Sequence, residues 1–287
     1  MHPSNGSGRQ AVAQLESALL LSGRDSDRVR VLGHRGSPGR GRPENSVAAV
    51  TAALRQGGDG AEIDVRLTAD HQLVLSHDAS VVTPDGRRLG VAASTRDELV
   101  NATGGDPVAT LADVLAAMQR PVGSELLVEA KSVTDVAVAV RTAAVLGDVL
   151  GSAAGSADVT VSSFDPALLR LIRRACADLP VRTALLGETW DPAATVVQRA
   201  HQDGHDEVHL ALAAVRRSPW AVQTARALGL AVSCWTVNRR SDLRWVADLG
   251  VDAVITDDVH GARIELDRVA AGAEAGAEAG ALAVASA

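Results

Sequence analysis

Residues 29–67 read VRVLGHRGSPGRGRPENSVAAVTAALRQGGDGAEIDVRL. The apolar runs at 29–34 and 61–67 predict β-strands, and the helical periodicity of residues 46–56 predicts a helix between them. Both runs are nearly continuous in apolar residues, which is typical of strands covered on both faces of a parallel sheet. This stretch therefore predicts a strand–helix–strand unit.

The same unit recurs along the chain. Further apolar runs are ELLVEAK (125–131), DVTVSSF (158–164), VRTALL (181–186), EVHLAL (207–212), AVSCWTV (231–237) and VDAVIT (251–256). Each precedes a segment with helical periodicity, and Asn45, Thr110, Asp165 and Ser218 stand where helix N-caps are expected. Eight units in about 240 residues predict an α/β fold of (β/α)8 TIM-barrel type. An open Rossmann-type sheet is the alternative, but the first strand-to-helix turn lacks G-x-G-x-x-G.

Composition suggests one domain flanked by two different ends. We expect residues 29–268 to form the barrel. Residues 1–28 are polar at their start and predict a partly disordered segment with a short helix at 11–22. Residues 269–287 repeat Ala, Gly and Glu with no large side chain apart from Leu282, which fits a weak helix or a flexible tail, and the tail is favoured.

Charge and residue usage exclude several classes of function. The 287 residues carry a formal net charge of −7 without a long basic run, and they include four Trp, one Phe and no Tyr. This combination argues against nucleic-acid binding, which needs basic surface and stacking aromatics. No segment reaches the apolar length of a membrane span, and the N-terminal run ALLL is too short for a secretory signal. The predicted location is the cytoplasm; the oligomeric state stays open.

Carboxylates gather on two of the predicted strands. Glu62 and Asp64 are two residues apart in AEIDVRL and therefore project from the same face, as do Glu129 and Lys131 in LLVEAK. Like charges at a barrel mouth are costly unless a cation joins them, and a set of oxygen ligands is what Mg²⁺ or Ca²⁺ prefers. The alternative is simple ion pairing among Glu62, Asp64, Arg66 and Lys131.

Two histidines also stand at predicted strand ends. His34 closes VLGH and His77 closes LVLSH, so both are expected beside the carboxylates. Imidazole can serve as base for one oxygen and acid for another near neutral pH. With Arg35 and Lys131 close by, this set suggests phosphoryl chemistry on an anionic substrate. His209 in EVHLAL is a further candidate for substrate contact, although a buried barrel histidine is the favoured interpretation. His201, His205 and His260 are expected on the surface.

The ordered set of motifs resembles one known family. HRG (34–36), PENS (43–46), AEIDVRLTAD (61–70), LVLSHD (73–78), PVATL (107–111), VEAK (128–131), SSFD (162–165), CWTVN (234–238) and VDAVITDD (251–258) follow the order seen in glycerophosphodiester phosphodiesterases. The resemblance covers about 230 residues. It implies a barrel enzyme that hydrolyses a phosphodiester of glycerol with one divalent metal ion, Mg²⁺ or Ca²⁺, and two histidines.

The resemblance also implies roles for individual residues. Glu62, Asp64 and Glu129 resemble the metal ligands, and His34 and His77 resemble the acid–base pair. Further residues resemble the substrate site: Arg35 and Lys131 for phosphate oxygens, Trp235 and Phe164 for the pocket wall, and Glu44 at the edge of the site. The family commonly has Gly where His71 stands, Thr where Ser46 stands, a larger aliphatic at Ala130 and Pro at Val259.

The resulting expectation is hydrolysis of small glycerophosphodiesters to an alcohol and glycerol phosphate, with a cyclic phosphate as the intermediate that the resemblance suggests. Two alternatives remain. One is a related phosphodiesterase activity on lysophospholipid or sphingolipid head groups, which residues 78–106, poor in large apolar side chains, do not favour. The other is a non-catalytic barrel that binds a phosphoester.

Overall fold

The computed structural model describes residues 28–285 except 105–107, 119–122, 154 and 156, and side chains only as far as residue 272. Its elements run in this order: β1 (Arg30–Gly33), α2 (Val47–Arg55), β2 (Gly60–Leu67), β3 (Leu73–Leu75), β4 (Ser80–Val82), β5 (Arg88–Gly90), the 3₁₀ turn η1 (Val91–Ala93), α3 (Arg96–Ala102), α4 (Leu111–Ala117), β6 (Glu125–Ala130), α5 (Val136–Ser152), β7 (Asp158–Ser163), α6 (Pro166–Ala175), β8 (Val181–Gly187), α7 (Ala193–Gln202), β9 (Glu207–Ala211), α8 (Leu212–Arg217), α9 (Trp220–Ala227), β10 (Ala231–Trp235), α10 (Arg240–Asp248), β11 (Ala253–Thr256) and α11 (Val259–Ala285).

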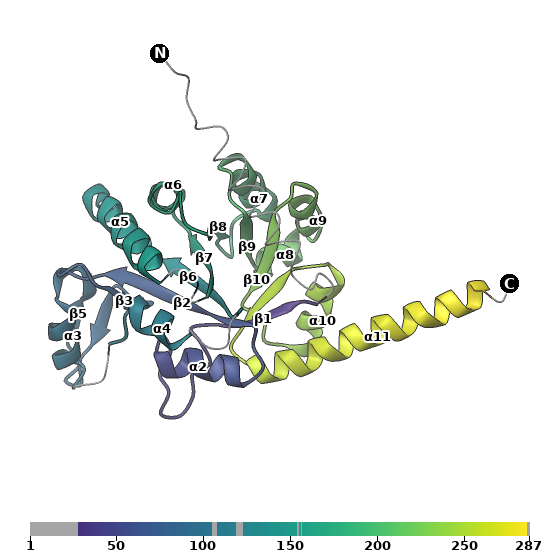
Figure 1. The fold of residues 1–287 in the computed structure, drawn as a ribbon, viewed down its shortest axis with the longest axis horizontal. Helices are drawn as coiled ribbons and strands as arrows, with labels where there is room; N and C mark the ends of the chain where they lie inside the picture. Colours follow the sequence, from purple (N-terminus) through teal and green to yellow (C-terminus); the bar gives the residue numbers. More distant parts are fainter. Residues whose placement is uncertain (1–27, 105–107, 119–122, 154, 156, 286–287) are drawn as a thin grey trace, which may run out of the picture.

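Among the described residues, eight parallel strands close into a barrel with helices outside it (Figure 1). Their order is β1, β11, β10, β9, β8, β7, β6 and β2, and β1 closes the ring by pairing with β2 as well as β11. The eight strands are those predicted from the apolar runs, so the TIM-barrel prediction is confirmed. Their carboxyl ends share one rim, which is where such barrels hold their chemistry.

The segment between β2 and β6 adds structure to the repeating strand–helix unit. β3 pairs antiparallel with the end of β2, and β4 and β5 form a separate two-stranded sheet followed by η1 and α3. The loop expected between residues 78 and 106 therefore contains a small folded insertion, visible beside the barrel in Figure 1. It lies directly after His77 and borders the rim.

Small aliphatic side chains build the core, as the shortage of aromatics requires. Leu146, Leu169 and Val197 are fully buried in the helix layer against the outside of the barrel. Inside the barrel, a smaller apolar cluster contains Leu32 and Leu127, and Trp235 packs against it. This cluster forms a floor beneath the rim.

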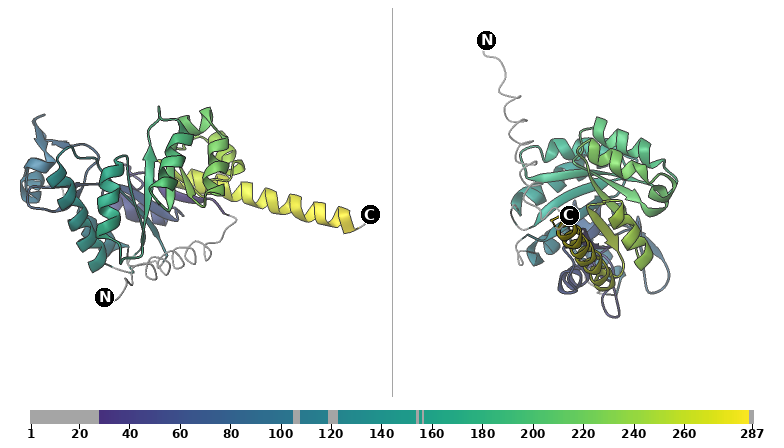
Figure 2. Two further views of the ribbon diagram at one scale, coloured as in Figure 1. Left: turned by 90° about the horizontal axis from the view of Figure 1, so that it is seen from above. Right: turned by 90° about the vertical axis from the view of Figure 1, so that its right-hand side faces the viewer.

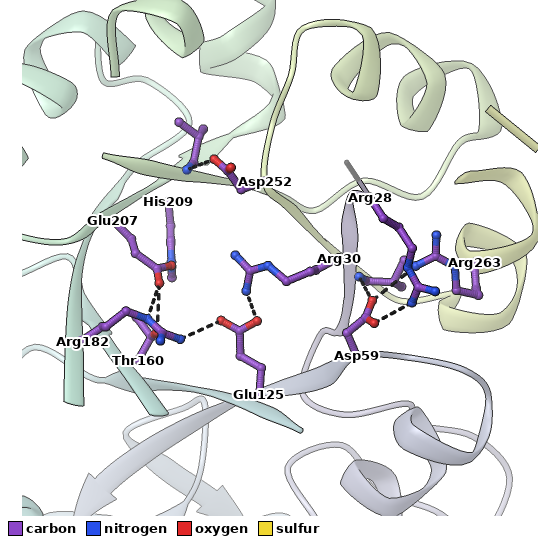
Figure 3. A network of polar contacts seen from close by, with 12 residues as sticks. Arg28, Arg30, Asp59, Glu125, Thr160, Arg182, Glu207, His209, Asp252 and Arg263 are labelled. Atoms are coloured by element: carbon purple, nitrogen blue, oxygen red, sulfur yellow. Dashed lines mark hydrogen bonds and ion pairs between the residues drawn. The ribbon is translucent and has the colours of Figure 1, made fainter. Parts of the chain in front are cut away.

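A buried ionic network fills the opposite end of the barrel (Figure 3). Arg182 contacts Glu207 at 2.8 Å and Glu125 at 3.4 Å, and Glu125 also pairs with Arg30. His209 Nε2 lies 3.3 Å from a Glu207 oxygen and is 1% exposed. The favoured interpretation of His209 as a buried barrel histidine agrees with this position.

Helix starts follow local capping chemistry. Thr110 and Asp165 cap α4 and α6, as predicted. At α2 the cap is Ser46, whose side chain accepts a hydrogen bond from Ala49, and not Asn45, whose side chain faces the barrel rim. At α9 the cap position is Pro219 and not Ser218.

His71, in the turn between β2 and β3, takes a left-handed φ of 61°, which explains why glycine suits this position.

Sequence analysis made a prediction for each end of the chain. The partly disordered segment expected at residues 1–28, with its short helix at 11–22, lies largely outside the described residues, because these begin at residue 28. At the other end, α11 continues as a helix to Ala285 and projects from the barrel (Figure 2), where the composition favoured a tail. Ala has the highest helix propensity, which accounts for the helical form.

Among described residues, no helix is long and apolar enough to cross a membrane. The cytoplasmic location stays a prediction.

Candidate active site

Three carboxylates lie together at the rim. Glu62 and Asp64 come from β2 and Glu129 from the neighbouring β6, where Asp64 and Glu129 are register partners. Strand alternation turns all three side chains to the barrel interior. Each offers an oxygen within 4.8 Å of the others, and all three residues are buried. The structure thus brings together the three residues predicted as metal ligands.

Two cations contact this carboxylate cluster. Lys131 Nζ lies 2.7 Å from Asp64 and 2.5 Å from Glu129. The Arg35 backbone N–H donates to Glu62 at 2.9 Å, while its guanidinium lies 3.5 Å from Asp64 and donates to Glu44 at 2.9 Å. Glu44 therefore fixes the guanidinium of Arg35 at the edge of the site.

Arg66 contacts a backbone carbonyl, whereas the ion-pairing alternative expected it to pair with Glu62 and Asp64. Its guanidinium donates twice to the His77 carbonyl, at 3.1 and 2.8 Å. Burial lowers the pKa of Arg66, although Asp64 and Glu129 act in the opposite direction. Arg66 therefore ties the His77 loop to β2.

The carboxylates carry more negative charge than their surroundings balance. Burial raises the pKa of Glu62 well above its usual value, and the charges of Asp64 and Glu129 raise it further. Burial also raises the pKa of Glu129, to about 7, against the opposing effect of Lys131. For Asp64 the effect of burial is outweighed by Lys131 and by a hydrogen bond from Asn45, so its pKa is lowered. A divalent cation would relieve this excess.

Asn45 was missed as a site residue. Its side-chain amide donates to Asp64 at 2.8 Å, and its carbonyl oxygen accepts the Asp64 backbone N–H at 2.9 Å. The residue has φ of 53°, a left-handed conformation that Asn tolerates better than most residues. Asn45 lies within the motif PENS (43–46), but its position just before the helical segment 46–56 indicated a helix cap.

The two predicted histidines follow strand ends close to the cluster. His34 follows β1, and the next residue, Arg35, contacts Glu62 through its backbone. The backbone N–H of Ser76 donates to the Asp64 carbonyl at 3.0 Å, which holds His77 beside β2. Both predicted residues therefore lie at the same rim as the carboxylates.

Each histidine has an acidic partner that sequence reasoning did not select. His34 Nδ1 lies 2.7 Å from Asp257, and His77 Nδ1 lies 2.9 Å from Asp78. These contacts leave the Nε2 atom of both rings available for another partner. Asp257 and Asp78 occur within the TDD and LSHD strings, so the only signal was their neighbourhood to other site motifs.

The two predicted aromatic residues meet at the rim. Phe164 and Trp235 pack edge to face, with ring centroids 5.7 Å apart and planes at 80°. Trp235 Nε1 is buried without a hydrogen-bond partner among the described atoms.

Glu188, directly after β8, was not predicted as a site residue. Its pKa is raised by burial and by the charge of Asp191.

The other histidines lie away from the cluster. His209 belongs to the buried ionic network, and His201 and His260 are exposed on helices as expected. His205 was expected on the surface, but it is 5% exposed and shares a 3.0 Å hydrogen bond with Thr183. Burial lowers its pKa to about 4, so the turn after α7 holds it as a neutral imidazole.

Comparisons with known proteins agree with this geometry. A family model described as the glycerophosphoryl diester phosphodiesterase family matches residues 34–260. A Mycobacterium tuberculosis protein named "Probable glycerophosphodiester phosphodiesterase 1" is 32% identical over 243 residues, which are 77% of this chain and 86% of that protein.

Solved structures share the fold. A glycerophosphodiester phosphodiesterase from Thermotoga maritima matches with a TM-score of 0.66 and 25% identity over 81% of this chain and 96% of that one. A phosphodiesterase from Oleispira antarctica, in complex with the product sn-glycerol-3-phosphate, matches with a TM-score of 0.69 and 23% identity over 84% and 97%. The chain belongs to the glycerophosphoryl diester phosphodiesterase family.

Proposed function

We propose that this chain is a metal-dependent phosphodiesterase that hydrolyses small glycerophosphodiesters to an alcohol and glycerol phosphate. The observation that carries the proposal is the buried carboxylate cluster of Glu62, Asp64 and Glu129. His34 and His77 follow strand ends at the same rim. The family membership favours an enzyme over the non-catalytic binding barrel.

The cluster fits one hard divalent cation, Mg²⁺ or Ca²⁺. Its donors are carboxylate oxygens from adjacent strands, which are the preferred ligands of both ions. Lys131 and Arg35 supply two positive charges to a cluster of three buried carboxylates, so an excess of negative charge remains. When bound there, the cation would polarise a non-bridging phosphate oxygen and offset negative charge in the transition state.

Arg35 and Lys131 are the proposed phosphate-binding residues. Both cations already lie at the cluster, and Glu44 holds the guanidinium of Arg35 in place. Two fixed positive charges stabilise the charge that develops on phosphate oxygens during displacement. Glu44 acts through Arg35 and does not need to touch the substrate.

His34 and His77 are the proposed acid–base pair. His34 would accept the proton of the glycerol hydroxyl next to the phosphate as that oxygen attacks phosphorus. His77 would protonate the leaving alcohol oxygen as its bond to phosphorus breaks, which leaves a cyclic phosphate. Water then opens the ring with the two proton transfers reversed.

The proposed substrate is small and soluble. The Phe164–Trp235 pair offers an apolar wall of a size that suits glycerol. The Oleispira antarctica relative holds sn-glycerol-3-phosphate, which supports a glycerol phosphate product here. Residues 78–106, which follow His77, contain few large apolar side chains, which disfavours the lysophospholipid and sphingolipid alternative.

The test is release of glycerol phosphate from a panel of glycerophosphodiesters with Mg²⁺, Ca²⁺ or a chelator. Wild type should turn over one or more of these in a chelator-sensitive way, and Glu62→Gln should not. Metal binding measured by calorimetry gives a second readout that is independent of turnover. A folded protein that binds metal yet hydrolyses none of the panel would contradict the substrate proposal.

The histidine pair has its own test. His34→Ala and His77→Ala should each slow turnover by roughly 10²- to 10⁴-fold, because each removes one proton transfer. The exposed His201, far along the chain on α7, provides the matched control, His201→Ala. Nearly normal turnover by either of the first two variants would refute the pair.

A further inference from the structure

The contact between His34 and Asp257 joins β1 to the end of β11. His34 Nδ1 and Asp257 Oδ1 are 2.7 Å apart, a distance that requires one proton between them. The hydrogen bond from His34 lowers the pKa of Asp257, so this carboxylate is ionised and can only accept. The proton therefore resides on Nδ1, and neutral His34 carries its free lone pair on Nε2.

Asn238, just beyond β10, holds the other oxygen of the same carboxylate. Its Nδ2 donates to Asp257 Oδ2 at 2.6 Å. The orientation of the Asn238 amide is fixed because its oxygen accepts the Asp257 backbone N–H at 2.9 Å and the Thr256 hydroxyl at 3.0 Å. A backbone N–H can only donate, so the amide nitrogen must face the carboxylate.

The second histidine lacks this arrangement. Its partner Asp78 is the next residue in the chain, and the other Asp78 oxygen pairs with Arg88 at 3.9 Å. The side chains of Arg88 and Asp78 are 62% and 64% exposed, and such contacts contribute little orientation. The two histidines therefore differ in how firmly their rings are held.

We propose that Asp257 is a positioning residue that sets the tautomer and ring orientation of His34, and that Asn238 is the residue that orients Asp257. The inference rests on the proposed function, in which His34 is the base. A lone pair on Nε2 is what a base needs, and the carboxylate stabilises the imidazolium that forms when the proton arrives. The charge of Arg35 also acts on Asp257, so the base and the phosphate-binding side chain share one electrostatic environment.

Asp257→Asn tests the tautomer. Asn238 still presents its amide nitrogen, so the amide introduced at position 257 turns its oxygen toward Asn238 and its NH₂ toward His34. Nδ1 must then accept, the ring proton moves to Nε2, and the base is lost. Turnover should fall by roughly 10²- to 10⁴-fold with normal metal binding, the usual cost of losing one proton transfer.

The double variant Asp257→Asn with Asn238→Asp separates orientation from charge. A carboxylate at position 238 accepts the NH₂ of the amide at position 257, which turns the oxygen of that amide back toward His34. Turnover should recover at least tenfold over Asp257→Asn. The acid limb of the kcat/KM profile should lie at lower pH than in wild type, because the adjacent carboxylate no longer stabilises the imidazolium.

Asp258→Asn is the matched control, since it removes the neighbouring charge but keeps a cap for the Gly261 N–H at the start of α11. It should behave as wild type. If His34→Ala retains activity, the proposed function fails. If His34→Ala is inactive while Asp257→Asn stays within about threefold of wild type, only this inference is overturned. A folded double variant without recovery would refute the role of Asn238.

Discussion

Each charged side chain of the site depends on a polar neighbour for its position. Asn45 holds Asp64 through two hydrogen bonds, Glu44 holds Arg35, and Asp257 contacts His34. A charged side chain that rotates freely must be oriented before each reaction, which costs entropy. A side chain held by hydrogen bonds is already in the reactive orientation. The chemistry of the site therefore requires the supporting residues as well as the reacting groups.

Asn45→Gly measures one such support. Glycine keeps the left-handed backbone at φ 53° but removes both side-chain hydrogen bonds to Asp64. Divalent-cation affinity should fall about 10- to 100-fold, the usual cost of losing a hydrogen-bond partner of a metal ligand. Isothermal calorimetry with Mg²⁺ and Ca²⁺ checks this.

The control for that variant is Asn101→Gly in α3, where the side chain is exposed. It should lower stability by less than about 0.5 kcal/mol, because Asn is itself a weak helix former, and it should leave cation affinity unchanged. Equal affinities for Asn45→Gly and wild type would show that Asp64 does not need Asn45 to bind metal.

Sequence reasoning selected the proposed reacting groups and Glu44 but not the other supporting residues, for a physical reason. Glu62 and Asp64 share a face because strand side chains alternate, which spacing alone reveals. The contact between His34 and Asp257 spans 223 residues and depends on the barrel closing between β1 and β11. Asn45 required a positive φ that residue order does not disclose.

At the scale of elements, continuous apolar runs predicted the eight barrel strands because both faces of each strand are covered. The insertion from β4 to α3 was missed because β4 and β5 have only three residues each. Strands that short leave too little periodicity to recognise. The rim that holds the candidate site thus includes the part of the fold that the sequence specifies least clearly.

The ionic network inside the barrel predicts a large stability effect. Arg182→Met removes the cation between Glu125 and Glu207 and leaves buried carboxylates with less compensation. The free energy of unfolding should fall by about 3–5 kcal/mol, measured by urea denaturation. Arg170→Met, which loses only an exposed contact with Asp203, should cost at most about 1 kcal/mol. Similar losses in both variants would contradict a stabilising network.

Glu207 gives stability a defined dependence on pH. Burial would raise its pKa, but the hydrogen bond from His209 and the charge of Arg182 hold it well below the usual value. The stabilisation is therefore complete above the unfolded pKa of about 4.3 and is lost as pH falls through the folded value. As the pH falls from about 4.3 to 2, the free energy of unfolding should decrease less for Glu207→Gln than for wild type, because glutamine has no carboxylate to protonate.

Urea titrations across that pH range provide the measurement. One proton changes the slope by up to about 1.4 kcal/mol per pH unit. Asp148→Asn, at an exposed position on α5, should retain the wild-type slope. If Glu207→Gln retains it too, other carboxylates dominate the response to acid.

At the scale of the whole molecule, the two ends of the barrel divide stability from chemistry. The amino ends of the strands hold the ionic network of Glu125, Arg182 and Glu207, in which positive and negative charges alternate (Figure 3). The carboxyl ends hold the carboxylate cluster with its excess negative charge. The apolar floor around Leu32 and Trp235 lies between them. Substitutions at one end should therefore leave the other largely unchanged.

The final helix shows how far along the chain the packed barrel extends. Early in α11, Leu266 is buried and Arg263 contacts Asp59 at 3.3 Å, whereas the later turns project from the barrel (Figure 1). Removing residues 273–287 deletes an Ala- and Gly-rich stretch with no large side chain beyond one leucine to bury. Turnover should stay as in wild type and the unfolding free energy should change by less than about 0.5 kcal/mol. Leu266→Ala should instead cost about 2–5 kcal/mol, because it leaves a cavity against the barrel. Thermal unfolding of both proteins decides the matter: a clear drop in Tm on truncation would mean that the projecting turns pack on the barrel in solution.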